Sequence, residues 1–270
     1  MKRFIGKVVL ITGASRGIGR AVAKAFAEED AWVALCSRDH AALTDLAEEL
    51  NQSDGRAIAL KCDVTDKTQV TEAVTKLSER WGKLEVVVNN AGVSGRTPID
   101  EDSDDRWHEI LNTNLTGSYL VTKAALDLMN SGWGRIINIS SVLGRFGVPG
   151  YAAYCTSKHG IIGFTRALAL ELVSRGITVN AISPGWVSTE MADKGIRETA
   201  EVIGISPDEF REQAIAAVPI RRFIEPEEVA KLVLYLASNE AAAITGQTLS
   251  LIHISEPTRL VHSSRMPSSA

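Results

Sequence analysis

Residues 7–19 read Lys-Val-Val-Leu-Ile-Thr-Gly-Ala-Ser-Arg-Gly-Ile-Gly, and this stretch decides the fold. The apolar run predicts a β-strand over residues 7–12, and the alanine-rich segment that follows predicts a helix. A strand, a glycine-rich turn and a helix N-terminus together point backbone N–H groups and the positive end of a helix dipole toward an anion. Gly13 would permit the tight turn, Gly17 would let a pyrophosphate approach, and Gly19 would let the helix pack closely on the sheet.

The rest of the chain repeats this alternation of short apolar strands and longer helical stretches. Further strands are predicted at residues 32–36, 57–61, 84–89, 134–140, 177–182 and 248–251. The run Val86-Val87-Val88 is apolar without alternation, which is typical of a strand whose two faces are both covered by helices. We therefore predict an α/β fold, a doubly wound parallel sheet of the Rossmann kind with helices on both faces, built as one domain over residues 1–250.

The composition narrows the classes of function. The chain has 270 residues and a formal net charge of -4, so it has no excess of Lys and Arg with which to bind nucleic acid. The first seven residues lack the apolar run of a secretory signal or membrane span, which predicts a cytoplasmic protein without a membrane partner. The three cysteines are too few for a disulfide framework, and no spacing of Cys and His predicts a metal site.

Three short motifs carry a resemblance to a known family. They are Thr12-Gly13-Ala14-Ser15-Arg16-Gly17-Ile18-Gly19, Cys62-Asp63-Val64 and Asn89-Asn90-Ala91-Gly92. The glycine spacing is not G-x-G-x-x-G, so the first motif alone leaves a purely structural turn open. Together the motifs resemble those of the short-chain dehydrogenases/reductases, and the resemblance extends over residues 7–250. It implies that a nicotinamide dinucleotide is bound by Gly13, Ser15, Arg16, Gly17, Ile18, Gly19, Asn90, Ala91 and Gly92, with Asp63 and Val64 at its adenine.

The end of the second predicted strand indicates which nicotinamide cofactor is used. NAD enzymes of this fold place an acid there for the ribose 2′-hydroxyl, whereas NADP enzymes leave space and supply arginine. Here Ser37 stands at the position of the acid, and Arg38 with Arg16 can form a charge-assisted fork around a 2′-phosphate. We therefore predict NADP(H) rather than NAD(H). The alternative is that both arginines are solvated surface charges.

Tyr154 and Lys158 are four residues apart, so on a helix both side chains lie on one face. This pair, with Ser141 at the end of the fifth predicted strand and Asn114, resembles the family's catalytic residues. The resemblance implies that Tyr154 exchanges a proton with the substrate oxygen and that Ser141 stabilises the charge on that oxygen. Lys158 would lower the pKa of Tyr154 and bind the nicotinamide ribose, and Asn114 would position a water that joins Lys158 to solvent.

The segment after the sixth predicted strand reads Ser183-Pro184-Gly185-Trp186-Val187-Ser188-Thr189. It resembles the family's P-G loop, which implies that Pro184, Gly185, Val187 and Thr189 border the nicotinamide. In isolation the P-G pair is equally typical of a plain turn. We expect substrate selectivity to reside in residues 93–97, 143–150 and the helical stretch 191–218. A largely hydrophobic pocket is predicted from Phe146, Trp186, Met191, Ile196, Ile203 and Phe210.

The resemblance implies an NADP(H)-dependent oxidoreductase that transfers a hydride between nicotinamide and a ketone or secondary alcohol. The chain is most similar to 3-oxoacyl-acyl-carrier-protein reductases, which suggests a 3-oxoacyl thioester. Of the two basic residues with which those enzymes dock the carrier protein, Arg175 is present but Gly132 stands at the other position. Small ketones, cyclic ketones, sugars and coenzyme A thioesters therefore stay open. Other readings are a catalytically inactive nucleotide-binding member, an NAD-dependent alcohol or sugar dehydrogenase, and a nucleotide-sugar epimerase, which normally has a longer chain.

The tail departs from the family. Members usually continue from residues 244–250, Ile-Thr-Gly-Gln-Thr-Leu-Ser, into V-D-G-G, which completes the last strand and a tetramer interface. Here the sequence continues Leu-Ile-His-Ile-Ser-Glu-Pro-Thr-Arg and ends in a Ser/Arg/Pro-rich stretch. That run resembles translated sequencing-adapter sequence, so residues 251–270 are expected to be an artefactual or disordered tail that weakens a homotetramer. A lineage-specific extension is the alternative.

Overall fold

The computed structural model describes residues 2–51, 56–100, 103–129 and 132–251, and within them seven parallel strands form one sheet. The strands are β1 (Val8–Thr12), β2 (Trp32–Ser37), β3 (Ala57–Lys61), β4 (Val86–Asn89), β5 (Gly134–Ile139), β6 (Ile177–Pro184) and β7 (Thr248–Leu251). Their order across the sheet is β3-β2-β1-β4-β5-β6-β7. Every predicted strand is present, with ends that differ by one or two residues, which is the usual uncertainty at strand and helix ends. The α/β fold class is thereby confirmed.

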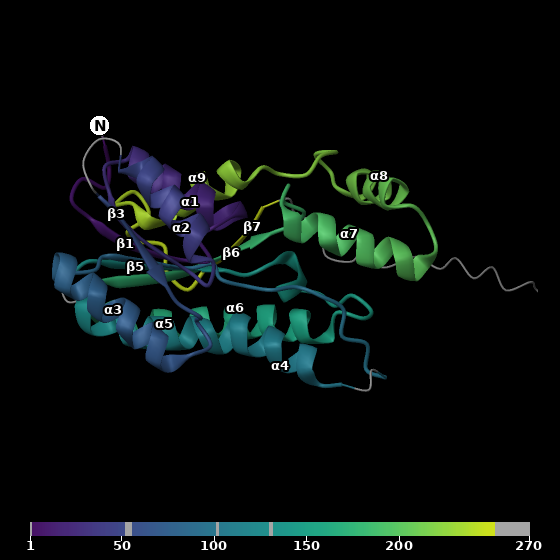
Figure 1. Ribbon diagram of the computed structural model, residues 1–270, viewed down its shortest axis with the longest axis horizontal. Coiled ribbons are helices and arrows are strands. Elements are labelled where there is room, and N and C mark those ends of the chain that lie inside the picture. The colour runs from purple at the N-terminus through teal and green to yellow at the C-terminus, as the bar shows by residue number, and fades with distance from the viewer. Residues whose placement is uncertain (1, 52–55, 101–102, 130–131, 252–270) are drawn as a thin grey trace, which may run out of the picture.

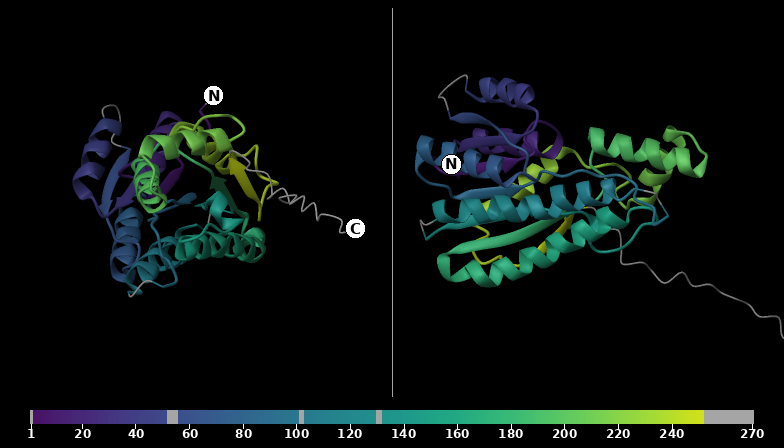
Figure 2. Two further views of the ribbon diagram at one scale, coloured as in Figure 1. Left: turned by 90° about the vertical axis from the view of Figure 1, so that its right-hand side faces the viewer. Right: turned by 60° about the horizontal axis from the view of Figure 1, so that its bottom comes forward.

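Helices cover both faces of this sheet (Figures 1 and 2). One face carries α1 (Gly17–Glu28), α2 (His40–Leu50) and α9 (Pro226–Ala237), and the other carries α3 (Lys67–Trp81), α5 (Gly117–Ala125) and α6 (Ala152–Leu172). Successive residues of one strand serve the two cores, because Val86 and Val88 pack under the first set of helices and Val87 under the second. The uninterrupted apolar strands predicted from the sequence follow from this double cover.

The remaining elements lie around these layers. They are α4 (Asp105–Leu111), a π-helix (Asn112–Thr116), 3-10 turns at Leu126–Leu128, Val142–Gly144 and Val173–Arg175, and α7 (Glu190–Ile203) with α8 (Pro207–Ala217). α7 and α8 extend beyond the sheet, past the carboxyl ends of its strands (Figures 1 and 2). The predicted helical stretch 191–218 is thus confirmed as two helices. No described helix is both long and apolar enough to cross a membrane.

The strand order reverses between β1 and β4, which is where open α/β sheets form a ligand crevice. Two turns meet there and are joined by hydrogen bonds. The Thr12 hydroxyl accepts from the backbone N–H groups of Asn90 and Ala91, both at 3.0 Å. In return, the Asn90 side-chain amide donates to the carbonyl oxygens of Thr12 at 2.9 Å and Gly13 at 3.1 Å. The two turns are therefore held as one unit.

Polar side chains also tie the strands to the helices below them. Asn89 at the end of β4 donates through Nδ2 to Asn138 Oδ1 of β5 and to Thr122 Oγ1 of α5, both at 2.8 Å. Asn138 Nδ2 in turn donates to Thr165 Oγ1 of α6 at 2.9 Å. All four residues are buried, so these bonds fix α5 and α6 against the sheet in a weakly screened environment.

At the opposite edge, β7 pairs with β6 as far as Leu251, which lies opposite Pro184. Leu251 O also accepts a hydrogen bond from Gly185 N at 3.0 Å, so the last strand borders the loop after β6. The rest of the predicted tail, residues 252–270, lies outside the described residues. Cys36, Cys62 and Cys155 are free and buried, as expected of small core residues.

The buried carboxylate of Glu85 joins the starts of β1 and β4 and allows a test of the fold. Its Oε2 accepts from Val8 N at 2.8 Å and its Oε1 lies 3.0 Å from Lys83 Nζ. Glu85→Ala leaves the buried Val8 N–H without this acceptor, so we expect the free energy of unfolding in urea to fall by about 1–3 kcal/mol.

The matched control is Glu49→Ala. Glu49 forms ion pairs with Lys24 at 2.6 Å and Arg20 at 2.7 Å, but at the surface, so its loss is expected to cost less than about 1 kcal/mol. Equal losses in the two variants would contradict this account of Glu85.

Candidate active site

A cleft of about 950 Å³ opens at the carboxyl ends of the strands, between the glycine-rich turn and α7. Of the residues predicted to bind cofactor or act in catalysis, the structure brings all but two to its walls. They are Gly13, Ser15, Arg16, Gly17, Ile18, Ser37, Arg38, Asp63, Val64, Asn90, Ala91, Gly92, Ser141, Tyr154, Lys158, Pro184, Gly185, Val187 and Thr189. The two that do not line it, Gly19 and Asn114, lie directly behind the wall.

Gly19 sits where α1 packs on the turn. A Cβ at this position would overlap the carbonyl oxygen of Gly13 and lie 2.5 Å from Asn90 Nδ2. Only glycine therefore lets the helix approach the hydrogen-bonded unit of Thr12 and Asn90 this closely, as the sequence predicted. Gly19 shapes the cleft without facing it.

The N-terminus of α1 faces the cleft. Gly13 and Gly17 have φ values of 65° and 52°, a conformation that L side chains rarely adopt. A Cβ on Gly17 would also approach Thr189 Cγ2 to 3.3 Å. No described side chain caps this helix, so its first N–H groups and its dipole are available to an anion.

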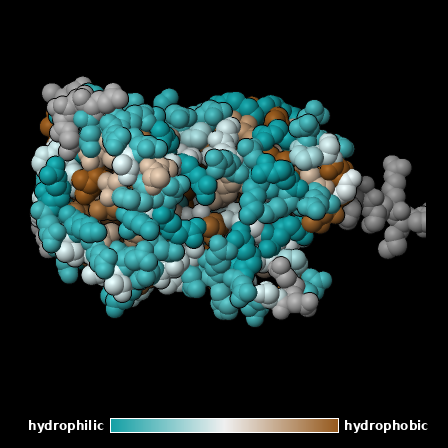
Figure 3. All heavy atoms as spheres, viewed as in Figure 1, coloured by the Kyte–Doolittle hydropathy of each residue, from teal (hydrophilic) through white to brown (hydrophobic). Residues whose placement is uncertain are grey.

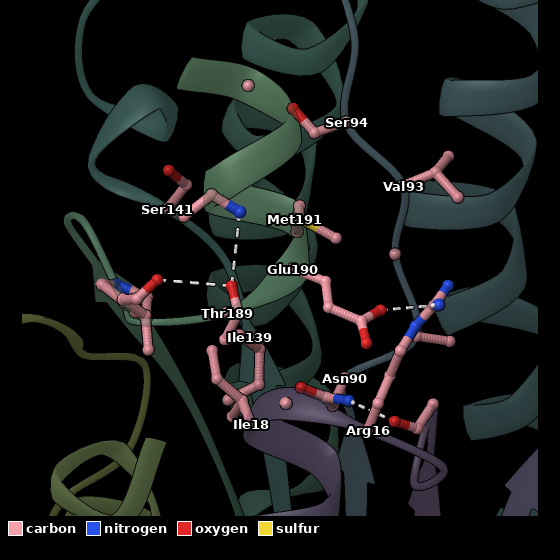
Figure 4. A pocket seen from close by; sticks show the side chains of 18 of the residues that line it. Arg16, Ile18, Asn90, Val93, Ser94, Ile139, Ser141, Thr189, Glu190 and Met191 are labelled. Carbon is pink, nitrogen blue, oxygen red and sulfur yellow. Dashed lines mark hydrogen bonds and ion pairs between the residues drawn. The ribbon is translucent and has the colours of Figure 1, made fainter. Parts of the chain in front are cut away.

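The two arginines expected to hold a 2′-phosphate each face a carboxylate in this structure. Arg16 Nη1 lies 3.1 Å from Glu190 Oε2 at the start of α7, and Figure 4 shows the two side chains pointing toward each other. Arg38 Nη1 lies 4.0 Å from Asp63 Oδ2. These exposed pairs contribute at most about 1 kcal/mol each, so a phosphate group can replace the carboxylates at little cost.

The three central candidates come from two neighbouring elements. Ser141 follows β5, and α6 carries Tyr154 in its first turn and Lys158 one turn later. Lys158 is buried, its Nζ donates to Ile139 O at 2.8 Å, and this nitrogen lies 5.6 Å from the centre of the Tyr154 ring. Ser141 and Tyr154 both line the cleft, and the Ser141 hydroxyl acts to lower the pKa of the Tyr154 hydroxyl. Phenol, hydroxyl and ammonium are therefore adjacent at the floor of the cleft.

Burial sets the pKa values of the two groups. Burial of the phenol raises the pKa of Tyr154 to about 12, and Ser141 offsets only part of that rise. The expected lowering of this pKa by Lys158 and a bound nicotinamide stays a prediction. Burial also lowers the pKa of Lys158 to about 8. Both shifts have the same cause, because each charged form loses hydration in the packed floor of the cleft.

Asn114 lies in the π-helix between α4 and α5, an irregularity often found at functional sites. Its Oδ1 accepts from Val93 N at 2.8 Å, and its Nδ2 donates to Val93 O and to Ser157 Oγ, both at 3.0 Å. A Cβ on Gly92 would lie 3.3 Å from Asn114 Oδ1 and 3.7 Å from Lys158 Nζ. Asn114 thus fixes the loop after β4 beside Lys158.

The other end of the cleft is mainly apolar. Its lining includes Val142, Leu143, Phe146, Val148, Pro149, Tyr151, Trp186, Met191 and Phe210. Two residues that were predicted to line the hydrophobic pocket do not line it. Ile196 is buried between α7 and α8, against Ala214 and Phe223, and Ile203 is 52% exposed at the end of α7. Figure 3 shows hydrophobic side chains gathered at that far end of α7 and α8.

Tyr151 lines this end of the cleft, although the sequence predicts no role for it. Arg96 and Thr199 line it too, and both lie in the stretches expected to determine substrate selectivity, residues 93–97 and 191–218. The Tyr151 hydroxyl and Thr199 Oγ1 form a 3.0 Å hydrogen bond between α7 and the start of α6. A signal for Arg96 was present, because it is the one charged residue between Asn89 and Thr97. Its neighbourhood could not be read from the sequence, because Tyr151 is distant along the chain.

Comparison with known proteins agrees with this geometry. Residues 13–251 match a family model described as Enoyl-(Acyl carrier protein) reductase. A 3-oxoacyl-acyl-carrier-protein reductase of Thermotoga maritima is 38% identical over 250 residues, which cover 92% of this chain and 97% of that protein.

Solved structures give the same result. A variant of actinorhodin polyketide ketoreductase with NADPH is 40% identical with a TM-score of 0.87, covering 91% of this chain and 95% of that one. An NAD⁺-bound xylitol dehydrogenase is 34% identical with a TM-score of 0.88, covering 93% and 99%. The fold, the glycine-rich turn and these matches over nearly the whole described chain show that the protein belongs to the short-chain dehydrogenase/reductase family.

Proposed function

We propose that this enzyme is an NADP(H)-dependent oxidoreductase that interconverts a ketone and a secondary alcohol, with a 3-oxoacyl thioester or similar carbonyl compound as substrate. One observation carries the proposal. The Tyr154 hydroxyl, its partner Ser141 and the buried Lys158 lie in the same cleft as the uncapped N-terminus of α1. Proton-transfer groups and an anion site therefore share one cavity, as a dinucleotide-dependent carbonyl reductase requires.

The residues present fit a bound NADP(H). The positive-φ glycines and the α1 N-terminus suit the pyrophosphate, and the cleft is continuous from there to Tyr154. Ser37, Arg38 and Arg16 stand around the end of β2, where a 2′-phosphate would lie. The relative with NADPH supports this choice, whereas the NAD⁺-bound relative shows that the fold itself does not decide it.

When bound, the nicotinamide supplies or accepts the hydride. In reduction, Tyr154 donates its proton to the substrate oxygen while Ser141 donates a hydrogen bond to the same atom. A Tyr154 pKa of about 12 keeps the phenol protonated at neutral pH, which is the form that reduction requires. As the proton leaves, the nearby Lys158 stabilises the phenolate, and its pKa of about 8 suits it to pass on a proton near neutrality.

The other functions considered are less well supported. An inactive nucleotide-binding member would not need Ser141, Tyr154 and Lys158 packed together at the floor of the cleft. An NAD-dependent dehydrogenase would be expected to have an acid in place of Ser37, and Asp39 does not serve, because it caps α2 by accepting from Ala42 N. The expected cytoplasmic location and homotetramer stay predictions.

Tyr154→Phe tests the proposed acid. The variant keeps the aromatic ring but lacks the transferable proton, so kcat for NADPH-dependent ketone reduction should fall by ~10²–10⁴-fold. NADPH affinity, measured by fluorescence titration, should change little. The control is Tyr119→Phe, which removes a half-exposed hydroxyl on α5 that contacts only Lys123 among the described residues. Turnover near the wild-type value in Tyr154→Phe would refute the mechanism.

Arg38→Ala tests the cofactor assignment. Losing one charge-assisted contact to a 2′-phosphate should raise the Kd for NADPH by ~10–100-fold. NADH lacks that phosphate, so its Kd should hardly change. Arg80→Ala is the control, because it removes the same charge from the exposed end of α3, away from the cleft. Equal losses for both cofactors would show that Arg38 does not read the 2′-phosphate.

A further inference from the structure

The substrate end of the cleft holds Arg96, a cation that has no carboxylate partner among the described residues. Arg96 is half-buried and lines the cleft together with Ser141 and Tyr154, and no described carboxylate lies within ion-pair distance of it. The other arginines of the cleft differ, since their partners are Glu190 for Arg16, Glu49 for Arg20 and Asp63 for Arg38. An unpaired, partly desolvated guanidinium costs stability, so its presence in a ligand cavity indicates an anionic ligand.

The backbone on either side of Arg96 is fixed. On one side, Asn114 holds both polar groups of Val93, and the Arg106 guanidinium donates to Ser94 O. On the other side, Thr97 N donates to Gly150 O at 2.7 Å, and Thr97 Oγ1 accepts from Ala153 N at 3.0 Å. Arg96 is therefore presented from a rigid segment and not from a loose surface loop, as a specific binding site requires.

The guanidinium of Arg96 lies beside the Tyr151 ring. Its Cζ lies 5.9 Å from the centre of the Tyr151 ring, within the range of a cation–π contact, and Thr199 of α7 holds the Tyr151 hydroxyl. Gly150 leaves the necessary space, because a Cβ there would lie 2.6 Å from Arg96 Nη2, and its φ of 75° also favours glycine. A cation–π contact uses the charge of the guanidinium and leaves its N–H donors available.

Arg96 lies close to the reacting centre. Tyr151 is the N-cap residue of α6, three residues before Tyr154, and both side chains line the cleft. The wall around them is apolar, with Leu143, Phe146 and Met191 among its members. A ligand that reaches from Tyr154 to Arg96 therefore needs a carbonyl at one end, an apolar middle and an anion at the other end.

We propose that Arg96 determines substrate specificity by binding a carboxylate at the non-reacting end of the substrate, which is therefore an oxo acid with an apolar spacer. This inference rests on the proposed ketone reduction, and it names an oxo acid, in place of a 3-oxoacyl thioester, as the substrate class. A carboxylate matches the planar fork of a guanidinium and can accept two parallel hydrogen bonds from it. The phosphates of the cofactor do not compete for Arg96, because their proposed site is at the other end of the cleft.

The kinetic test compares acids with their uncharged esters. We would measure kcat/KM with NADPH for 4-oxopentanoate, 5-oxohexanoate and 6-oxoheptanoate, each beside its methyl ester, and use the acid-to-ester ratio. Wild type should prefer the best acid by ~10–100-fold, and Arg96→Met should bring this ratio close to one. Arg96→Lys, which keeps the charge but not the fork, should retain part of the preference.

Two controls separate a binding role from a structural one. Arg197→Met removes an exposed cation from α7 outside the cleft lining, and it should keep the wild-type ratio. Thermal unfolding shows whether Arg96→Met only weakens the packing on Tyr151, which would lower Tm without changing the ratio. A wild type without acid preference, or an Arg96→Met variant that keeps it, overturns the proposal.

A binding measurement keeps the inference separate from the proposed activity. Quenching of tryptophan fluorescence would report hexanoate and hexanamide binding, because Trp186 lines the cleft. If neither acids nor esters are reduced, the proposed function fails, yet hexanoate binding that Arg96→Met abolishes still supports the carboxylate site. Equal hexanoate binding in both proteins overturns it. A defect of Arg96→Met with acetoacetyl-coenzyme A alone would assign the anion to the coenzyme phosphate and also overturn it.

Discussion

The hydrogen-bonded unit of Thr12 and Asn90 is the constraint on which the site depends. It joins the turn after β1 to the turn after β4, at the point where the strand order reverses. Because Asn90 reaches the carbonyl oxygens of the glycine turn, there is no room for a side chain on Gly13 or Gly19. α1 must then begin close to the sheet with its dipole directed into the cleft. The side-chain amide of Asn90 thus helps to shape the part of the cleft where the cofactor phosphates are proposed to bind.

The same unit leads into the chemistry at the other end. Asn89, next to Asn90, connects β4 to β5 and α5, and Asn138 continues the connection to α6, which carries Tyr154 and Lys158. Asn114 then fixes the loop that leaves the turn of Asn90. The reacting groups are therefore positioned before any ligand arrives, which is what electrostatic stabilisation of a transition state requires. The cost is visible in Asn89 Oδ1, a buried oxygen without a partner among the described residues.

The sequence was informative wherever the signal is local. Uninterrupted apolar runs identified the strands, and the four-residue spacing of Tyr154 and Lys158 placed them on one helical face. It failed where the cause is tertiary packing. The high pKa of Tyr154 comes from burial that no spacing reports, and Ile196 packs against Ala214 of α8 and Phe223 instead of lining the cleft. The π-helix around Asn114 interrupts a helix that local sequence patterns treat as regular. The ion pair of Arg16 with Glu190 joins two segments that are far apart along the chain, so no local pattern predicts it.

The arginines at the two ends of the cleft differ in the contacts that they must lose when an anion binds. At the cofactor end, Arg16 and Arg38 exchange carboxylate partners for a phosphate. The free energy gained there is therefore only the difference between two ionic contacts, both near solvent. At the substrate end, Arg96 has no carboxylate partner among the described residues and is partly desolvated already. An anion that reaches it gains a charge-assisted contact in a less screened environment. A single half-buried arginine can therefore discriminate between substrates without first giving up a described carboxylate.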